Sequence, residues 1–220
     1  MLEKLLKRFP KINNRVVEPT QLMLSQYKAF VQSKVHVLQG VSCDWRQQTI
    51  EQYEKAGDSA KFHFISAVHS IYYVDDVEHS LMYLYNRLEP GGILLVIIVS
   101  ESGGLLRFAN HFLTFRDQMH YVSSADIRNF LDDRGIPYAQ YHQPSRLDIT
   151  ECFDEVSVEG TLLVDFITQV VNFKETAPED LQRSVMEYLG SSDCSEKNGD
   201  EVWFNDDWHA LVISKPEGAA

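Results

Sequence analysis

Positive charge is scarce in this sequence. Its 220 residues contain 20 Lys and Arg against 32 Asp and Glu, which gives a formal net charge of −12. The longest basic cluster, Lys4 to Arg8, is interrupted by Leu5 and Leu6. Nucleic-acid binding requires a basic face that neutralises phosphates, so we expect no nucleic-acid partner.

Cysteines and long apolar runs are also scarce. Cys43, Cys152 and Cys194 form no CxxC pair, which argues against structural zinc and favours free thiols in a reducing compartment. The longest apolar run, Ile93 to Val99, is too short to span a bilayer. Residues 1–9 mix acids and bases and lack the apolar stretch of a signal peptide. We therefore expect a cytoplasmic protein with no membrane partner.

Several catalytic patterns are missing as well. The nucleophile motif GxSxG, the phosphate-binding P-loop and the dinucleotide motif GxGxxG do not occur. No activating base stands beside Cys152, so a buried thiol is the favoured interpretation of that residue. Side chains of the kinds that bind zinc or iron gather at His63, His69, Asp75, Asp76 and His79. Their spacing matches no known ligand pattern, and we expect no metal site.

Apolar segments alternate along the chain with segments of helical spacing. The strands that this pattern predicts are residues 12–18, 35–38, 62–68, 93–99 and, at an edge of the sheet, 137–142. Strands that alternate with helices form βαβ units, so the sequence predicts an α/β protein with a doubly wound sheet.

The C-terminal third has fewer clear signals. Residues 160–173 are predicted to form a helix, residues 191–200 a loop, and residues 202–214 a hairpin or final strand. Before them, Ser123 and Asp126 resemble a capping box, which predicts that a helix begins there.

In open α/β sheets, ligands bind beyond the carboxyl ends of the strands. Glu18 ends the first predicted strand, where an acid can accept both ribose hydroxyls of a nucleotide; a capping or solvated acid is an equal alternative. Val68 and His69 end the third, although a loop histidine followed by core aromatics is the more common arrangement. Ser42 follows the second, where an ordinary polar loop is the stronger interpretation.

Six segments together carry a resemblance to a known family. Residues 13–19 with 26–28 resemble the second-strand region of the histamine N-methyltransferase family, and residues 62–74 are similar to its fourth strand and paired tyrosines. The match extends through 147–153, 165–173, 176–181 and 204–205, so that it covers nearly the whole chain. The Glu89-Pro90-Gly91-Gly92 turn is typical of class I methyltransferases in general.

The resemblance implies a Rossmann-like class I methyltransferase sheet. The expected enzyme transfers a methyl group from S-adenosylmethionine to a ring nitrogen of histamine. The neutral imidazole nitrogen has its own lone pair, so catalysis chiefly requires positioning and no catalytic side chain is expected. Residues 1–220 would form a single methyltransferase domain, with 144–205 as a substrate-side insertion or cap. The expected partner is a small histamine-like amine, and the protein is expected to be a monomer.

The resemblance also implies roles for individual residues. Those expected at the cofactor are Glu18 at the ribose, Ser42 near the adenine and Val68 in the pocket wall. Those expected at the substrate are His69, Tyr72, Tyr73, Phe173 and Asp206. Aromatic walls suit a cationic amine or sulfonium because the ring faces attract positive charge.

The sequence departs from the family pattern in three residues and one segment. His69 stands in place of a glutamine, Asp206 in place of an asparagine, and Met23 in place of a polar residue at the cofactor, so that the acceptor can be a different amine. The first strand and its glycine-rich loop are missing. We therefore expect a truncated form with bare strand edges and weak cofactor binding; the alternative is a non-catalytic methyltransferase-like protein that binds or regulates a partner.

Overall fold

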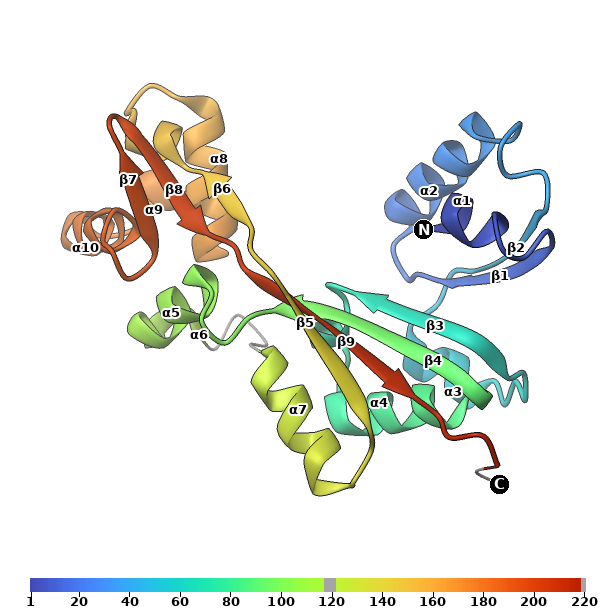
Figure 1. The fold of residues 1–220 in the computed structure, drawn as a ribbon. Coiled ribbons are helices and arrows are strands. Elements are labelled where there is room, and N and C mark those ends of the chain that lie inside the picture. Colours follow the sequence, from blue (N-terminus) through green and yellow to red (C-terminus); the bar gives the residue numbers. More distant parts are fainter. Residues whose placement is uncertain (117–121, 219–220) are drawn as a thin grey trace. The chain divides into compact units, whose positions relative to one another are not determined.

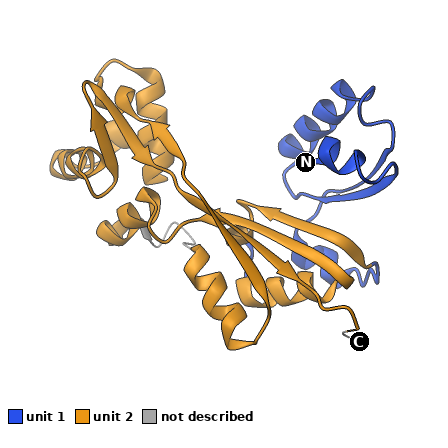
Figure 2. Cartoon of the chain, in the orientation of Figure 1, with its two compact units in different colours: residues 1–60, 74–76 blue, residues 61–73, 77–220 orange. Residues whose placement is uncertain are grey.

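A computed structural model describes residues 1–116 and 122–218, which form two compact units (Figure 2). Unit 1 contains residues 1–60 and 74–76, and unit 2 contains residues 61–73 and those from 77 onward. No helix in the described part of the chain is long and apolar enough to cross a membrane. The single domain expected over residues 1–220 stays a prediction.

Unit 1 consists of two parallel strands and three helices (Figure 1). Its elements are α1 (Leu2–Leu6), β1 (Ile12–Val17), α2 (Gln21–Ser33), β2 (Val41–Arg46) and α3 (Ile50–Lys55). Ile12 lies opposite Val41, and Val17 lies opposite Arg46, so the two strands end at the same edge. α3 begins with a capping box in which Thr49 and Gln52 satisfy each other's backbone amides.

The second strand lies later in the chain than the sequence pattern predicts. Residues 35–38 form turns, with Val35 and Val37 exposed, and the strand is β2 at Val41–Arg46. In β2 the side chains of Val41, Cys43 and Trp45 alternate with polar ones, which is the period-two pattern of a partly covered strand. The prediction of a strand at residues 35–38 was therefore wrong.

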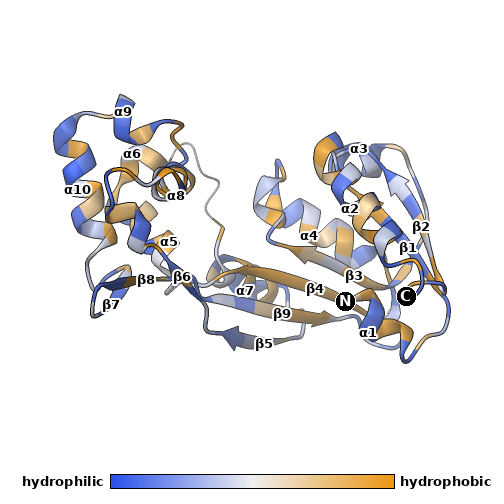
Figure 3. Ribbon diagram, turned by 90° about the horizontal axis from the view of Figure 1, so that it is seen from above, coloured by the Kyte–Doolittle hydropathy of each residue, from blue (hydrophilic) through white to orange (hydrophobic). Residues whose placement is uncertain are grey.

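Unit 2 is built around a four-stranded mixed sheet of order β3-β4-β9-β5. Its strands are β3 (Phe62–Val68), β4 (Leu88–Val99), β5 (Tyr138–Gln143) and β9 (Trp208–Ser214). β3 and β4 are parallel, and β9 runs antiparallel to both β4 and β5. Hydrophobic residues concentrate in the two central strands, β4 and β9 (Figure 3), where Leu94, Ile98 and Leu211 are fully buried. Within the described residues, β3 pairs only with β4, and in unit 1 β1 pairs only with β2.

Several short helices lie between these strands in the sequence of unit 2. They are η1 (Ile71–Tyr73), α4 (Val77–Asn86), α5 (Gly104–His111), α6 (Leu113–Arg116) and α7 (Ser124–Asp133). The capping box at α7 is confirmed, since Asp126 Oδ2 accepts the Ser123 backbone amide at 2.8 Å.

A second core lies beyond the four-stranded sheet, within the same unit. Its elements are β6 (Arg146–Asp148), η2 (Thr150–Phe153), α8 (Val158–Thr168), α9 (Phe173–Thr176), α10 (Glu179–Leu189), β7 (Ser195–Asn198) and β8 (Glu201–Asn205). β8 pairs antiparallel with both β6 and β7. α5 and α6 supply Phe108 and Phe115 to the core shared with these elements.

Three predictions for this region need correction. Residues 191–200 contain β7 as well as a loop. Residues 202–214 are divided between β8 and β9, which belong to different sheets. The helix predicted over 160–173 ends at Thr168, because Gln169 is left-handed and the Asp165 carboxylate binds the amides of Asn172 and Phe173 before α9.

Candidate functional site

Chain segments far apart in sequence meet at the carboxyl edge of β3 and β4. Val68 lies opposite Ile97, and the His69 amide donates to the Ile97 carbonyl at 2.8 Å. β9 begins at the same edge, with Trp208 opposite Val99. The His69 and Trp208 rings meet edge to face at 6.4 Å between centroids. This is the edge at which α/β sheets bind ligands.

Asp206 lies in the short link between β8 and β9, beside His69. Burial raises the pKa of the Asp206 carboxyl, while the nearby His69 lowers it and Asp207 raises it. The residue as a whole is exposed, so the desolvation is only partial. The structure therefore brings His69 and Asp206 together, as the resemblance implied, and adds Trp208, which sequence reasoning missed.

Tyr72 and Tyr73 follow His69 in the short helix η1. Their rings meet at 4.6 Å in an edge-to-face arrangement. Burial raises the pKa of Tyr72 to about 12, with Tyr73 adding to the shift, so the phenol stays protonated at neutral pH. Tyr73 is 78% exposed, which leaves its ring open to a ligand. Their role as walls of the amine site stays a prediction.

The other two expected residues of unit 2 lie in different surroundings. Val68 is 47% exposed at the end of β3, a position compatible with a ligand contact. Phe173 is 1% exposed and packs against Phe115 at 5.9 Å inside the second core. Its burial does not support the expected contact with substrate, because core packing already occupies the ring.

Glu18 follows β1 at the carboxyl edge of unit 1. Its Oε1 accepts the Thr20 amide at 2.7 Å, at the start of α2. Among the described residues Oε2 has no hydrogen-bond partner and can accept a ribose hydroxyl. The capping interpretation and the ribose interpretation are therefore compatible. Met23, on the exposed surface of α2, offers no polar atom beyond its sulfur.

Ser42 lies at the opposite end of the strands from Glu18. It is the second residue of β2, and its hydroxyl donates to Asn13 Oδ1 at 2.8 Å. It lies four positions before Arg46 at the carboxyl end, a distance of roughly 13 Å. The prediction that Ser42 follows the second strand is therefore wrong, whereas the adenine contact that the resemblance implies stays a prediction. Residues 47–49 now follow the carboxyl end of β2.

A buried polar network adjoins the unit 2 site. Ser124 Oγ lies 2.7 Å from His209 Nδ1 and 2.5 Å from Glu101 Oε2, and Arg128 donates to Glu101 Oε1 at 2.8 Å. Burial alone would raise the pKa of Glu101, but the hydrogen bonds from Ser124 and Arg128 hold it at about 2. Burial lowers the pKa of His209. Sequence reasoning missed this network, although Glu101 comes just after the carboxyl end of the apolar strand, where polar residues are informative.

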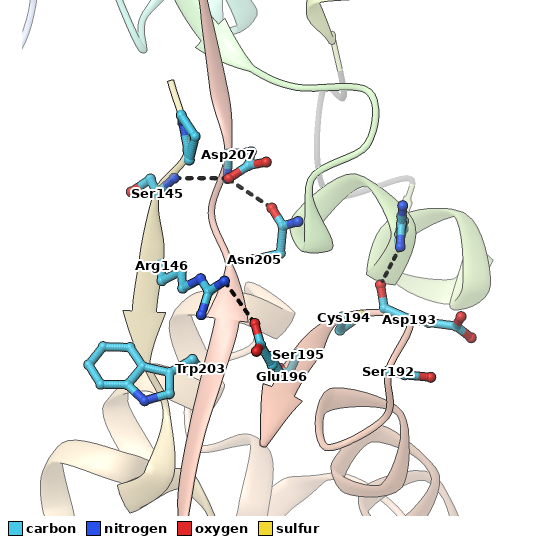
Figure 4. A pocket seen from close by; sticks show the side chains of 12 residues that line it. Ser145, Arg146, Ser192, Asp193, Cys194, Ser195, Glu196, Trp203, Asn205 and Asp207 are labelled. Carbon is cyan, nitrogen blue, oxygen red and sulfur yellow. Dashed lines mark hydrogen bonds and ion pairs between the residues drawn. The ribbon is translucent and has the colours of Figure 1, made fainter. Parts of the chain in front are cut away.

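A polar pocket of about 280 Å³ lies next to the link between β8 and β9. Figure 4 shows Asp207 between Ser145 and Asn205 at one side of this pocket. Arg146 pairs with Glu196 at 2.8 Å across it, so the pocket's charges are largely matched.

Two of the three thiols, Cys152 and Cys194, are buried. Burial raises the pKa of Cys152 to about 11 and that of Cys194 to about 12, so both thiols are inert. The described residues include no group of three or more His, Cys, Asp or Glu arranged to hold a metal ion.

Two solved structures share the fold. A methyltransferase structure from Bacillus halodurans C-125 superposes with a TM-score of 0.59 at 16% identity, covering 93% of this chain and 84% of the other. The YcgJ protein of Bacillus subtilis superposes with a TM-score of 0.57 at 16% identity, covering 93% and 82%. The predicted Rossmann-like class I methyltransferase fold is confirmed.

Relatives among curated proteins are closer in sequence. Histamine N-methyltransferase of Danio rerio is 36% identical over 97% of this chain and 76% of its own length, and that of Xenopus tropicalis is 35% identical over 98% and 76%. Carnosine N-methyltransferase 2 of Gallus gallus is 35% identical over 91% and 64%. No protein-family model matches the chain. At this identity and coverage, the chain is a methyltransferase and belongs to the histamine N-methyltransferase family.

Proposed function

We propose that the protein transfers a methyl group from S-adenosylmethionine to an imidazole nitrogen of a small cationic amine, with histamine as the first candidate. The observation that carries this proposal is the meeting of His69, Asp206 and Trp208 at the carboxyl edge of the sheet, with Tyr73 exposed in the adjoining helix. A carboxylate beside open aromatic rings suits an ammonium group.

Each unit, taken by itself, presents a residue that fits part of the cofactor. In unit 1, one carboxylate oxygen of Glu18 has no hydrogen-bond partner among the described residues and suits the ribose hydroxyls. In unit 2, Val68 presents an exposed apolar side chain at the end of β3. When bound, S-adenosylmethionine would supply an electrophilic sulfonium methyl group for the imidazole nitrogen. Asp206 would hold the amine, and the aromatic rings would orient the imidazole.

The acceptor can be larger than histamine. One relative is named a carnosine N-methyltransferase, and His69 adds a side chain that can be charged beside Asp206. An acceptor with a carboxylate as well as an amine would use both residues. A panel that contains histamine, carnosine and histidine separates these acceptors.

We also propose that one more strand added along β3 would raise the affinity for the cofactor. The support is that β3 pairs only with β4 among the described residues, and that no glycine-rich loop of the GxGxxG type occurs in the sequence. Bare strand edges readily take up another strand. We further propose that the protein is cytoplasmic and monomeric.

Titration of the purified protein with S-adenosylmethionine, followed by radiolabelled methyl transfer over the amine panel, tests the enzyme proposal. Cofactor-dependent transfer to an imidazole amine is expected, with Glu18→Gln weakening cofactor binding and Asp206→Asn raising the KM of the amine. Cofactor binding without transfer to any member of the panel would contradict the proposed acceptor class and favour the non-catalytic alternative.

A further inference from the structure

The link between β8 and β9 is tied to two other parts of unit 2. The Asp206 amide donates to the Ser145 carbonyl at 3.0 Å, and the Ser100 amide donates to the Asp207 carbonyl at 2.9 Å. Asn205 Oδ1 accepts the Asp207 amide at 3.0 Å. The backbone on both sides of Asp206 is therefore held by the segment after β4 and the segment after β5.

The Asp207 carboxylate is at the centre of these contacts. Its Oδ1 accepts the Ser145 amide at 2.9 Å, and its Oδ2 lies 2.9 Å from His142 Nε2 on β5. Because a carboxylate only accepts hydrogen bonds, Nε2 of His142 must carry the proton. The Asp207 side chain is 17% exposed, so this hydrogen bond is partly shielded from water.

Asp206 differs from its neighbour. Its backbone is held on both sides, but its carboxylate makes no hydrogen bond to any described residue. A fixed backbone with a free charged group is the arrangement expected of a residue that receives a ligand, since little side-chain and loop ordering remains to be done on binding. Figure 4 shows Asp207 directed toward Ser145 and Asn205.

We propose that Asp207 and His142 are positioning residues that hold the Asp206 carboxylate in place for the ammonium group of the acceptor. The inference rests on the proposed function, because it assumes that Asp206 meets the amine. Neither residue touches the substrate; both act through the backbone of the link.

Three variants separate positioning from general stability. Asp207→Asn keeps an oxygen for the Ser145 amide but replaces the charged acceptor that faces His142 with a neutral amide group. His142→Leu removes the donor, whereas His142→Gln retains an N–H that can reach Asp207. The matched control is Asp193→Asn, which removes the same charge from an exposed carboxylate in the adjacent pocket that makes no side-chain hydrogen bond to a described residue.

The expected result is a rise of about tenfold in the KM of the amine for Asp207→Asn and His142→Leu, the equivalent of one hydrogen bond to a charged group. The KM of S-adenosylmethionine should stay within twofold, as should both constants in His142→Gln and in the control. A purely structural role would change both constants together. An amine KM within twofold of the unmodified protein in Asp207→Asn would overturn the proposal.

Amide hydrogen exchange keeps this test separate from the proposed function. Without any ligand, Asp207→Asn should speed exchange at the amides of 206 and 207 at least tenfold, and the control should leave them unchanged. If the unmodified protein methylates no amine, the proposed function fails, and faster exchange still supports the positioning role in the link. Unchanged exchange in Asp207→Asn overturns that role whether or not the protein is an active enzyme.

Discussion

Glu101 and His209 are joined through a single hydroxyl, that of Ser124, which lies 2.5 Å from Glu101 Oε2 and 2.7 Å from His209 Nδ1. One hydroxyl proton can serve only one acceptor. The consistent arrangement has neutral His209 donating to Ser124 and Ser124 donating to the Glu101 carboxylate. Ser124 is fully buried, so water cannot replace it.

Replacement of Ser124 by alanine should therefore destabilise the protein by about 1–3 kcal/mol, because it leaves buried polar partners unsatisfied. The measurement is the urea midpoint of unfolding. Ser25→Ala on the exposed surface of α2 is the control and should stay within about 0.5 kcal/mol. Equal midpoints for the two variants would contradict the network.

The low pKa of Glu101 predicts an acid-side loss of stability. The pKa is about 2 in the folded protein against an ordinary value of 4.5, so the folded state favours the charged form. The stabilisation is complete above pH 4.5 and is lost as the pH falls from there toward 2. Glu101→Gln should thus have a lower Tm than the unmodified protein at pH 7, and the difference should shrink at pH 3. A difference that does not depend on pH would contradict this assignment.

The strands and caps that the sequence predicts correctly are encoded by neighbouring residues. β3 follows from a seven-residue run of mostly apolar side chains, and the α7 cap from two residues three positions apart. β2 was misplaced because residues 35–38 contain three apolar side chains but form no strand, whereas the weaker alternation in Val41–Arg46 indicates the strand.

The candidate site could be predicted only in part. Glu18 and His69 were found because each lies at the carboxyl end of a predicted strand. The network of Ser124 and His209 joins residues 85 positions apart, and no local pattern encodes that contact. For Phe173 the family resemblance implied a substrate contact, but the residue is buried in the core here.

Gly160 tests how closely α8 packs on η2. A Cβ at this position would lie 1.8 Å from the Glu151 carbonyl oxygen, which is backbone and cannot rotate away. Gly160→Ala should lower stability by about 1–3 kcal/mol or more through forced separation of the two elements. Gly190→Ala is the control, because its Cβ would meet the side-chain ring of Phe153 at 3.3 Å, and that residue is 41% exposed. Similar thermal midpoints for the two variants would show that α8 and η2 are farther apart.

The exposed ring of Tyr73 predicts an effect on binding without an effect on stability. Tyr73→Ala should raise the KM of a cationic amine by about 2- to 30-fold, the range of a cation–π contact, while Tyr73→Phe should leave it within twofold. Because the residue is 78% exposed, both variants should melt within a few degrees of the unmodified protein. Loss of affinity in Tyr73→Phe would indicate that the hydroxyl, and not the ring face, contacts the amine.

The three cysteines should differ sharply in reactivity. Cys152 and Cys194 are each 1% exposed, and burial raises their pKa values to about 11 and about 12, so almost no thiolate forms at pH 8. Cys43, on β2, is partly exposed. Iodoacetamide should therefore label one thiol in the folded protein and all three in denaturant, with Cys43→Ser abolishing labelling of the folded form. Rapid labelling of Cys152 in the folded protein would mean that η2 opens readily from α8, and it would contradict the close packing inferred at Gly160.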